Sequence, residues 1–251
     1  MVLNILFIGP AGSGKTSLTH RFGTWLEKEM KASAGYVNLD PGCRDVPYCP
    51  GFDIRKMFTI DGLMEKRRLG PNGAMILASE LMRKRAGGII REIRRIQADI
   101  RLVDTPGQME IFVFRPAGPA IVEALQATGT TVVVYIVDPT LASSALGLVT
   151  AFSLAISTQF RLEAPTVTVL NKSDRLKTRD IDKLLTDLDY LRERIVHSRS
   201  GVATDLALRY VSALKGLSRI YRIVRVSAKT GAGMGDLYDI CREALCVCGE
   251  M

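Results

Sequence analysis

The chain has 251 residues, of which 47% are hydrophobic and 24% are charged, a composition that is typical of folded domains and argues against a disordered chain. The net charge of +8 favours a partner that carries phosphates or acidic groups, with a generic basic surface as an equally good explanation. The five cysteines form no CxxC pair, which argues against a disulfide framework or a zinc site and favours a reducing cytoplasm.

Short apolar runs rich in β-branched residues alternate along the chain with longer amphipathic stretches. This alternation predicts a parallel sheet with helical crossovers. We expect strands at 3–8, 36–39, 100–103, 131–137, 166–170 and 221–226. We expect helices at 16–31, 74–97 (with Gly87-Gly88 as a candidate break), 116–127, 142–159, 179–197, 202–217 and 235–246. The longest strongly apolar run, 132–137, is too short to span a membrane, and the first residues lack the basic leader of a signal peptide.

Residues 9–16 read GPAGSGKT, which fits GxxxxGK[ST] in full and lies between a predicted strand and a predicted helix. In this motif the glycines allow backbone N–H groups to converge on phosphate oxygens, and the helix adds the positive end of its dipole. The ammonium of Lys15 would neutralise the β- and γ-phosphates, and the Thr16 hydroxyl would ligate Mg²⁺. The residues of this segment predicted to contact the nucleotide are Gly12, Ser13, Gly14, Lys15, Thr16 and Ser17.

The phosphate-binding segment and the alternating pattern together predict the fold class. We expect an α/β protein with the three-layer P-loop NTPase fold, built on a mainly parallel central sheet. Residues 1–251 are predicted to form a single domain. Two stretches, about 43–99 and about 177–219, exceed what a minimal nucleotide fold needs, so we interpret them as helical insertions.

A second metal anchor is predicted where the third strand ends in LVDTPGQ, residues 102–108. Asp104, at the tip of a buried strand beside the phosphate loop, is suited to anchor Mg²⁺, usually through water. Gly107 would let the backbone approach a γ-phosphate and move when that phosphate leaves. An isolated aspartate in such a position commonly caps a turn, but the string DTPG in register with the phosphate loop favours the metal role.

Residues 171–174 read NKSD and follow the fifth predicted strand. The carboxylate of Asp174 can accept both N1–H and N2–H₂ of guanine, whereas adenine offers an acceptor at N1 and has no 2-amino group. Lys172 would lay its stem along the base, and a backbone N–H of the SAK segment 227–229 can meet guanine O6. These features favour GTP as the nucleotide. The predicted base-binding residues are Asn171, Lys172, Asp174, Ser227, Ala228 and Lys229.

The chain resembles the GPN-loop GTPases, a family in the SIMIBI division of P-loop proteins. Residues 70–72 read GPN and lie in the insertion before the DTPG strand, where the family keeps its name-giving tripeptide. Residues 38–41 read NLDP, similar to the family's acidic switch, and residues 104–110 read DTPGQME, which looks like the family's second switch. The resemblance covers essentially the whole chain. The chain looks like a compact archaeal member, because it lacks the long acidic tail of eukaryotic members.

The resemblance implies a homodimer that faces nucleotide to nucleotide, with each GPN loop reaching into the partner's active site. Asn72 and its neighbouring backbone would contact the γ-phosphate, or the phosphate released, in the other subunit. A stiff polar loop of this kind supplies hydrogen bonds where charge develops, without an arginine finger. Within one subunit, Gly70–Asn72 would simply cap the helix that begins near Gly73, and both roles are compatible.

The resemblance also implies roles for the two switch segments. Asp40 and Gln108 would orient the attacking water, with Glu110 a lesser candidate. Asp40 has an alternative role on Mg²⁺ through a water, and the sequence does not separate the two. Loss of the γ-phosphate would relax both segments, so hydrolysis would act as a switch. The predicted catalytic residues are Lys15, Asp40, Gln108, Glu110, Gly70, Pro71 and Asn72, and the predicted Mg²⁺ ligands are Thr16, Asp104 and Asp40.

Two other functions are compatible with parts of the sequence. One is a GTP-dependent scaffold whose hydrolysis is incidental; the other is a P-loop kinase, which the NKSD segment argues against. Eukaryotic relatives are associated with RNA polymerase assembly, so a protein partner is expected through the resemblance alone. Basic clusters at 66–68, 83–85 and 91–95 favour a solvated helix face over nucleic-acid binding, because no aromatic stacking motif accompanies them. We expect a dimeric switch or assembly factor in the cytoplasm, with no membrane partner.

Overall fold

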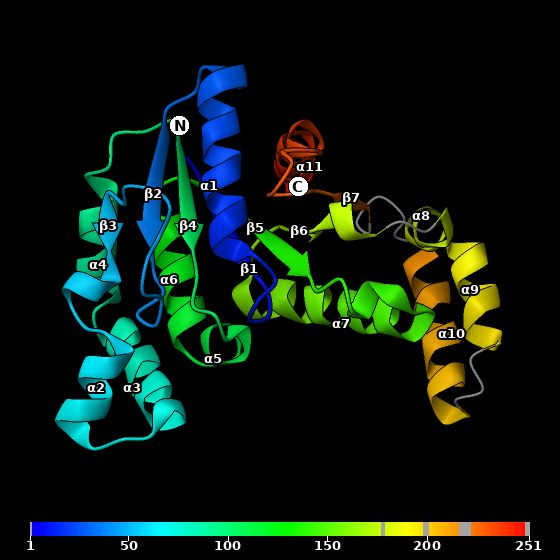
Figure 1. Cartoon of the computed structure of the whole chain (residues 1–251), viewed down its shortest axis with the longest axis horizontal. Coiled ribbons are helices and arrows are strands. Elements are labelled where there is room, and N and C mark those ends of the chain that lie inside the picture. The colour runs from blue at the N-terminus through cyan, green and yellow to red at the C-terminus, as the bar shows by residue number, and fades with distance from the viewer. Residues whose placement is uncertain (1, 177–178, 198–200, 216–221, 249–251) are drawn as a thin grey trace.

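The computed structural model describes residues 2–176, 179–197, 201–215 and 222–248. Its centre is a seven-stranded sheet in the order β3-β2-β4-β1-β5-β6-β7 (Figure 1), and every pairing between these strands is parallel. This architecture confirms the predicted fold class. The strands are β1 (Leu3–Ile8), β2 (Ala34–Asn38), β3 (Phe52–Asp53), β4 (Ile100–Asp104), β5 (Thr130–Val137), β6 (Thr166–Leu170) and β7 (Ile223–Arg225).

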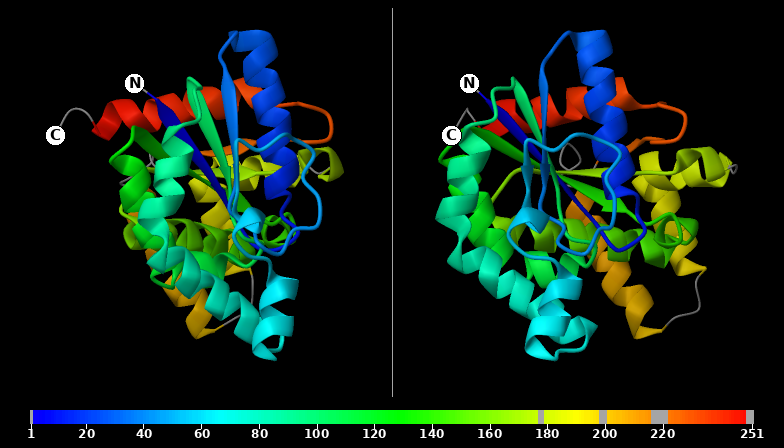
Figure 2. Two further views of the ribbon diagram at one scale, coloured as in Figure 1. Left: turned by 90° about the vertical axis from the view of Figure 1, so that its left-hand side faces the viewer. Right: turned by 60° about the vertical axis from the view of Figure 1, so that its left-hand side comes forward.

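Helices link the strands and cover both faces of the sheet, with α1 and α11 on one face and α4, α6 and α7 on the other (Figure 2). A five-residue π-helix, Leu26–Met30, continues α1. The helices are α1 (Lys15–Trp25), α2 (Ile60–Arg67), α3 (Pro71–Lys84), α4 (Ala86–Arg94), α5 (Met109–Val113), α6 (Ala117–Gln126), α7 (Ala145–Leu162), α8 (Arg179–Thr186), α9 (Leu188–Val196), α10 (Val202–Lys215) and α11 (Met234–Cys248).

Strand β5 shows how the sheet divides the hydrophobic core into two layers. Successive side chains of a strand point to opposite faces, so an apolar run of this length supplies both layers at once. The side chains that face α1 and α11 are Val132, Val134 and Ile136; those that face α6 and α7 are Val133, Tyr135 and Val137. All six are fully buried, which confirms the burial expected from the sequence. This packing on both faces holds β5 rigidly in the interior of the sheet.

The insertion at residues 43–99 differs from its prediction in detail. It contains β3 and α2, which were not predicted because two strand residues and an eight-residue helix are too short to show a periodic pattern. The predicted break at Gly87-Gly88 is wrong, since both glycines lie inside α4. The chain instead leaves helical geometry at Arg85, with φ −107° and ψ 10°, so α3 and α4 are separate helices.

Three further boundaries differ from their predictions. The helix expected at 179–197 is two helices, because the side chain of Asp187 accepts the N–H groups of Asp189 and Tyr190 and caps α9. The five-residue helix α5, directly after the DTPG segment, was not predicted. The strand expected at 221–226 is shorter, and its residue 221, like residues 216–217 of a predicted helix, lies outside the described residues.

Helix α7 is the one described helix whose length and hydropathy match a membrane span. It packs against the sheet, where its buried side chains include Leu148, Phe152 and Leu162. Core helices of this kind pass the same test of length and composition, so we interpret α7 as a core helix of the fold.

Candidate nucleotide-binding and catalytic site

The phosphate loop connects β1 to α1 at the carboxyl ends of the strands. Gly12 and Gly14 have φ angles of 76° and 91°, a left-handed conformation that side chains with a Cβ rarely adopt. A Cβ at Gly14 would also lie 2.6 Å from Nδ2 of Asn171. The glycines therefore allow the loop to close against the base-binding segment while its N–H groups and the start of α1 face the phosphate position.

Lys15 joins this loop to the DTPG segment. Its Nζ donates to the carbonyl oxygens of Gly9 (2.8 Å), Pro10 (3.0 Å) and Gly107 (3.1 Å). Burial lowers the pKa of this ammonium, and the nearby carboxylates, foremost that of Asp104, act in the opposite direction. Neutral carbonyls are weaker partners for an ammonium than phosphate oxygens, so β- and γ-phosphates would compete effectively for the Lys15 side chain.

Asp104 ends β4 and is fully buried. Its Oδ2 accepts a hydrogen bond from the hydroxyl of Tyr48 at 2.9 Å, while its Oδ1 has no partner among the described residues. Burial raises the pKa of Asp104 to about 6, and the nearby hydroxyls of Thr16 and Tyr48 act in the opposite direction. A buried carboxylate oxygen without a partner, beside the Thr16 hydroxyl and the phosphate loop, suits Mg²⁺ held jointly with substrate phosphates and water. Thr16 and Asp104 therefore fit the metal.

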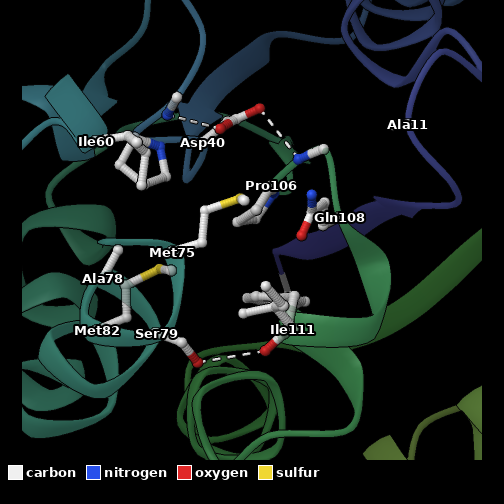
Figure 3. A pocket seen from close by; sticks show the side chains of 14 residues that line it. Ala11, Asp40, Ile60, Met75, Ala78, Ser79, Met82, Pro106, Gln108 and Ile111 are labelled. Atoms are coloured by element: carbon white, nitrogen blue, oxygen red, sulfur yellow. Dashed lines mark hydrogen bonds between the residues drawn. The ribbon is translucent and has the colours of Figure 1, made fainter. Parts of the chain in front are cut away.

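Asp40, in the first switch segment, contacts the second one. Its Oδ2 accepts the N–H of Gly107 at 3.2 Å, and its Oδ1 accepts the N–H of Gly42 at 2.8 Å (Figure 3). Burial raises the pKa of Asp40, opposed by these backbone N–H groups and by Lys15. The carboxylate thus couples the NLDP loop to the residue expected to approach the γ-phosphate.

The base-binding segments come together around Asn171, which is buried at the end of β6. Its Nδ2 donates to the carbonyl of Ser13 at 2.9 Å, and its Oδ1 accepts the N–H of Ala228 at 3.1 Å. Lys172 donates to the carbonyl of Gly12 at 2.5 Å. A single amide side chain therefore holds the phosphate loop and the SAK segment in register.

Asp174, the residue predicted to read the base, is held in place by the first residue of the SAK segment. The Ser227 hydroxyl donates to Asp174 Oδ1 at 2.6 Å, and this hydrogen bond is the main reason that the pKa of Asp174 lies below its ordinary value. The carboxyl group is exposed and ionised at neutral pH. It is therefore available to accept two N–H groups from guanine.

The remaining predicted catalytic residues lie in three places. Asp40, Gly107 and Gln108 line a cavity of about 200 Å³, whose lining also includes residues of α3 and α5, the first residue of α2 and Ala11 of the phosphate loop (Figure 3). Glu110 is exposed on α5. Gly70, Pro71 and Asn72 are exposed at the tip of the hairpin formed by α2 and α3, which extends beyond the carboxyl ends of the strands (Figure 1). The structure thus brings Gln108 and Asp40 together and leaves the GPN tripeptide at the tip of the hairpin.

Comparison with known proteins decides the family. A family model described as "Conserved hypothetical ATP binding protein" matches residues 7–247. The GPN-loop GTPase PAB0955 from Pyrococcus abyssi is 34% identical over 252 aligned residues, which cover 98% of this chain and 99% of the relative. The chain belongs to the GPN-loop GTPase family. It is accordingly a GTPase, and the NKSD and SAK segments agree with this family name rather than with the word ATP in the description of the family model.

A solved structure of the P. abyssi relative and two eukaryotic GPN-loop GTPases are similar to this chain over different shares of their lengths. The crystal structure of P. abyssi PAB0955, described as a GTPase in apo form, matches with a TM-score of 0.85 and 32% identity, covering 97% of this chain and 98% of that one. QQT2 from Arabidopsis thaliana is 34% identical over 92% of this chain and 61% of its own length. GPN-loop GTPase 1 from Saccharomyces cerevisiae is 31% identical over 92% of this chain and 63% of its own. The chain thus spans about three fifths of these two eukaryotic relatives.

The side chains that hold the switch loop of this GPN-loop GTPase were not predicted from the sequence. Buried Asn38 accepts the Asp40 N–H at 3.0 Å and donates to Asp53 at 3.0 Å. Asp53 also pairs with Arg55, whose guanidinium reaches the carbonyl of Arg44 at 2.5 Å. Asn38 belongs to the NLDP segment, but the only sequence signal for Asp53 and Arg55 is a set of polar residues between short apolar runs, which does not distinguish a network from a solvated loop.

The raised pKa of Asp104 predicts a pH-dependent stability. The folded, metal-free protein binds the proton more tightly than the unfolded chain, whose pKa is near 3.8, so the stability falls as the pH rises from about 4 to about 6. We expect Asp104→Asn, which keeps an oxygen for Tyr48, to raise the free energy of unfolding at pH 7 by up to about 3 kcal/mol and to have little effect near pH 4.

Urea unfolding of both proteins in EDTA across this pH range measures the difference. Adding Mg²⁺ with GDP should then stabilise the wild type more than the variant, because ligands stabilise the state that binds them. If Asp104→Asn is less stable than wild type at pH 7 in EDTA, the buried carboxylate of Asp104 does not destabilise the folded protein and the prediction is wrong.

Proposed function

We propose that this GTPase is a homodimeric, nucleotide-dependent switch that hydrolyses GTP with Mg²⁺, and that the GPN tripeptide of each copy completes the phosphate site of the other. The observation that carries the proposal is the position of the tripeptide. Gly70 caps α3 and Pro71 occupies its first position, a rigid start for a helix. All three residues, Gly70 to Asn72, are exposed at the hairpin tip, where a second molecule has access to them.

Each residue has a distinct role in the proposed reaction. Thr16 and Asp104 would hold Mg²⁺, which neutralises charge on the β- and γ-phosphates, and Lys15 would bind the same phosphates. Gln108 and Asp40 would orient the water that attacks the γ-phosphorus while the bond to the β-phosphate oxygen breaks. Glu110 stays a lesser candidate because it is exposed on α5. The side-chain amide of Asn72 from the partner would donate to the oxygens on which charge develops.

A chain of contacts from the phosphate site to the hairpin supports the switch. Gly107 donates to Asp40, and the next residue, Pro41, accepts the N–H of Ile60 at 3.0 Å. Ile60 is the first residue of α2. Movement of Gly107 on loss of the γ-phosphate would therefore be transmitted through Asp40 and Pro41 to the start of α2.

A second contact joins the other arm of the hairpin to α5. The buried hydroxyl of Ser79 on α3 donates to the carbonyl of Ile111 at 3.3 Å (Figure 3). The cavity described above lies between these two attachments. The hairpin therefore has two points of attachment to the switch segments, with unfilled volume between them, an arrangement suited to two alternative positions.

Two alternatives share parts of this geometry. A scaffold with incidental hydrolysis would use the same site and differ only in what the nucleotide state controls. A P-loop kinase needs an acceptor pocket and no guanine reader, so the contacts around Asn171 and Asp174 argue against it. A protein partner, including the RNA polymerase assembly that the family resemblance suggests, and the cytoplasmic location both stay predictions.

Turnover on dilution tests the dimer. GTP turnover per protomer is expected to fall as wild-type protein is diluted, in step with loss of dimer mass by size-exclusion chromatography with light scattering. Asn72→Ala is expected to lose about 10²-fold in kcat, comparable to loss of one charge-stabilising donor, while its affinity for GDP stays within twofold of wild type.

The matched control for this variant is Glu65, an exposed polar residue on α2 of the same hairpin. Glu65→Ala should retain wild-type turnover at every dilution. A demonstrated monomer that hydrolyses GTP as fast as the dimer, together with a fully active Asn72→Ala, would refute the dimeric mechanism and leave the tripeptide as a helix start.

A further inference from the structure

Arg21 is a residue of α1 that belongs to none of the nucleotide motifs, yet it contacts the SAK segment directly. Its Nε donates to the carbonyl of Ala228 at 2.9 Å, and its Nη2 donates to the carbonyl of Lys229 at 3.0 Å. The two consecutive carbonyls are thus bound by one planar guanidinium. A fork of this kind fixes direction as well as distance, because its donors are held rigidly relative to one another.

Because of the geometry of the peptide bond, this contact also sets the direction of the Lys229 N–H. The carbonyl of Ala228 and the N–H of Lys229 belong to the same planar trans peptide unit, so they point in opposite directions. Since Arg21 holds the carbonyl toward α1, the Lys229 N–H points away from α1. The other N–H groups of the segment are engaged: that of Ala228 by Asn171, and that of Thr230 by the Ser227 hydroxyl.

The Lys229 N–H has no hydrogen-bond partner among the described residues. It belongs to the segment that Ser227 ties to Asp174. On the guanine ring O6 lies next to N1, so a base whose N1–H and N2–H₂ are read by Asp174 presents O6 beside them and needs one donor there. The Lys229 N–H is a free donor in the segment that borders the carboxylate.

We propose that Arg21 is a positioning residue for guanine recognition: it sets the Ala228–Lys229 peptide so that the Lys229 N–H is presented to O6. This inference rests on the proposed guanine site around Asp174. It also links the two ends of the nucleotide, because Arg21 lies on α1, the helix that begins at Lys15 and that would bind the phosphates. Helix α1 would then position both the contacts to the base and the contacts to the phosphates.

The test compares two nucleotides that differ at position 6 and, as a result, at N1, which carries a proton in guanine and none in 2,6-diaminopurine; each variant is therefore compared with wild type on the same nucleotide. Guanosine diphosphate has the O6 acceptor, whereas 2,6-diaminopurine riboside diphosphate carries an amino group in its place. Arg21→Ala is expected to weaken the binding of GDP about tenfold, the value of roughly one hydrogen bond. It should weaken the binding of the diaminopurine nucleotide less than twofold. Inosine diphosphate, which keeps O6 and lacks the 2-amino group, should weaken by the same factor as GDP.

Two further variants separate positioning from charge. Arg21→Lys keeps the positive charge and lacks the fork, so it should also weaken GDP, by less than Arg21→Ala does. Arg161→Ala, which removes an exposed arginine from α7, should change no affinity. Full recovery of GDP affinity in Arg21→Lys would overturn the proposal, and so would equal weakening of GDP and the diaminopurine nucleotide by Arg21→Ala.

Asp174→Asn, measured with the same nucleotides, distinguishes failure of this inference from failure of the proposed site. If Asp174→Asn leaves GDP affinity unchanged, the guanine site itself is wrongly placed and the inference falls with it. If Asp174→Asn weakens GDP while Arg21→Ala leaves the preference for GDP over the diaminopurine nucleotide unchanged, the site stands and the role of Arg21 is wrong.

Discussion

Asp174→Asn is expected to weaken GDP about 10³-fold and to create binding of xanthosine diphosphate. Two hydrogen bonds to an ionised acceptor are lost, and each is worth more than a hydrogen bond between neutral groups. The asparagine Nδ2 now opposes the guanine 2-amino group, so two donors face each other. Xanthine carries an oxygen at that position, to which the asparagine Nδ2 donates, while the asparagine oxygen still accepts N1–H.

The orientation of the new amide follows from the structure. Ser227 donates to Asp174 Oδ1, and an asparagine oxygen at that position would keep the same contact. Dissociation constants for GDP and xanthosine diphosphate, measured by fluorescent-nucleotide displacement, show directly whether the base preference has changed. Asp239→Asn, at an exposed aspartate on α11, is the matched control and should bind GDP as wild type does. Unchanged preference for GDP in Asp174→Asn would place the base elsewhere.

Lys15→Ala is expected to lower the rate of GTP hydrolysis on the order of 10³-fold, in the range found when a group that stabilises transition-state charge is removed. The ammonium lies beside Asp104 and Asp40, so its loss leaves these carboxylates facing the phosphates without compensation. Single-turnover hydrolysis at saturating GTP separates this effect on the rate from the weaker binding that accompanies it.

Folding and surface charge need to be controlled in the Lys15→Ala measurement. Circular dichroism and the midpoint of thermal unfolding show whether the variant keeps the fold. Lys28→Ala removes an exposed lysine from the π-helix that continues α1 and should hydrolyse GTP at the wild-type rate. A Lys15→Ala protein within tenfold of that rate would show that the P-loop ammonium is not part of the catalytic site.

The sequence predicted the parts of this fold that depend on local pattern. Strand β5 carries a long apolar run. The phosphate loop, DTPG and NKSD follow strand ends, so their meeting at one edge of the sheet follows from parallel topology. Elements as short as β3 and α5 give no periodic signal. They are stabilised by contacts with residues distant in sequence, and only the folded chain shows these contacts.

Site residues outside the motifs escaped prediction for a related reason. Tyr48 reaches Asp104 across 56 positions in the chain, and Arg21 reaches Ala228 across 207. An arginine on a helix is usually a surface residue, and tyrosines are of intermediate burial in general, so nothing in the local sequence distinguishes these two. The direction of the α2–α3 hairpin depends likewise on the attachment of Ile60 to Pro41.

Mixing two inactive variants tests most directly whether the GPN tripeptide acts on the partner. Asn72→Ala has an intact phosphate site and a defective tip; Lys15→Ala has an intact tip and a defective phosphate site. In a mixed dimer with two-fold symmetry, the intact site receives the intact tip. Equal mixing is therefore predicted to restore about one quarter of wild-type GTP turnover, since about half of the dimers are mixed and each has one working site. Turnover that stays at the sum of the two separate variants, in samples shown to exchange subunits, would contradict a tripeptide acting across the dimer.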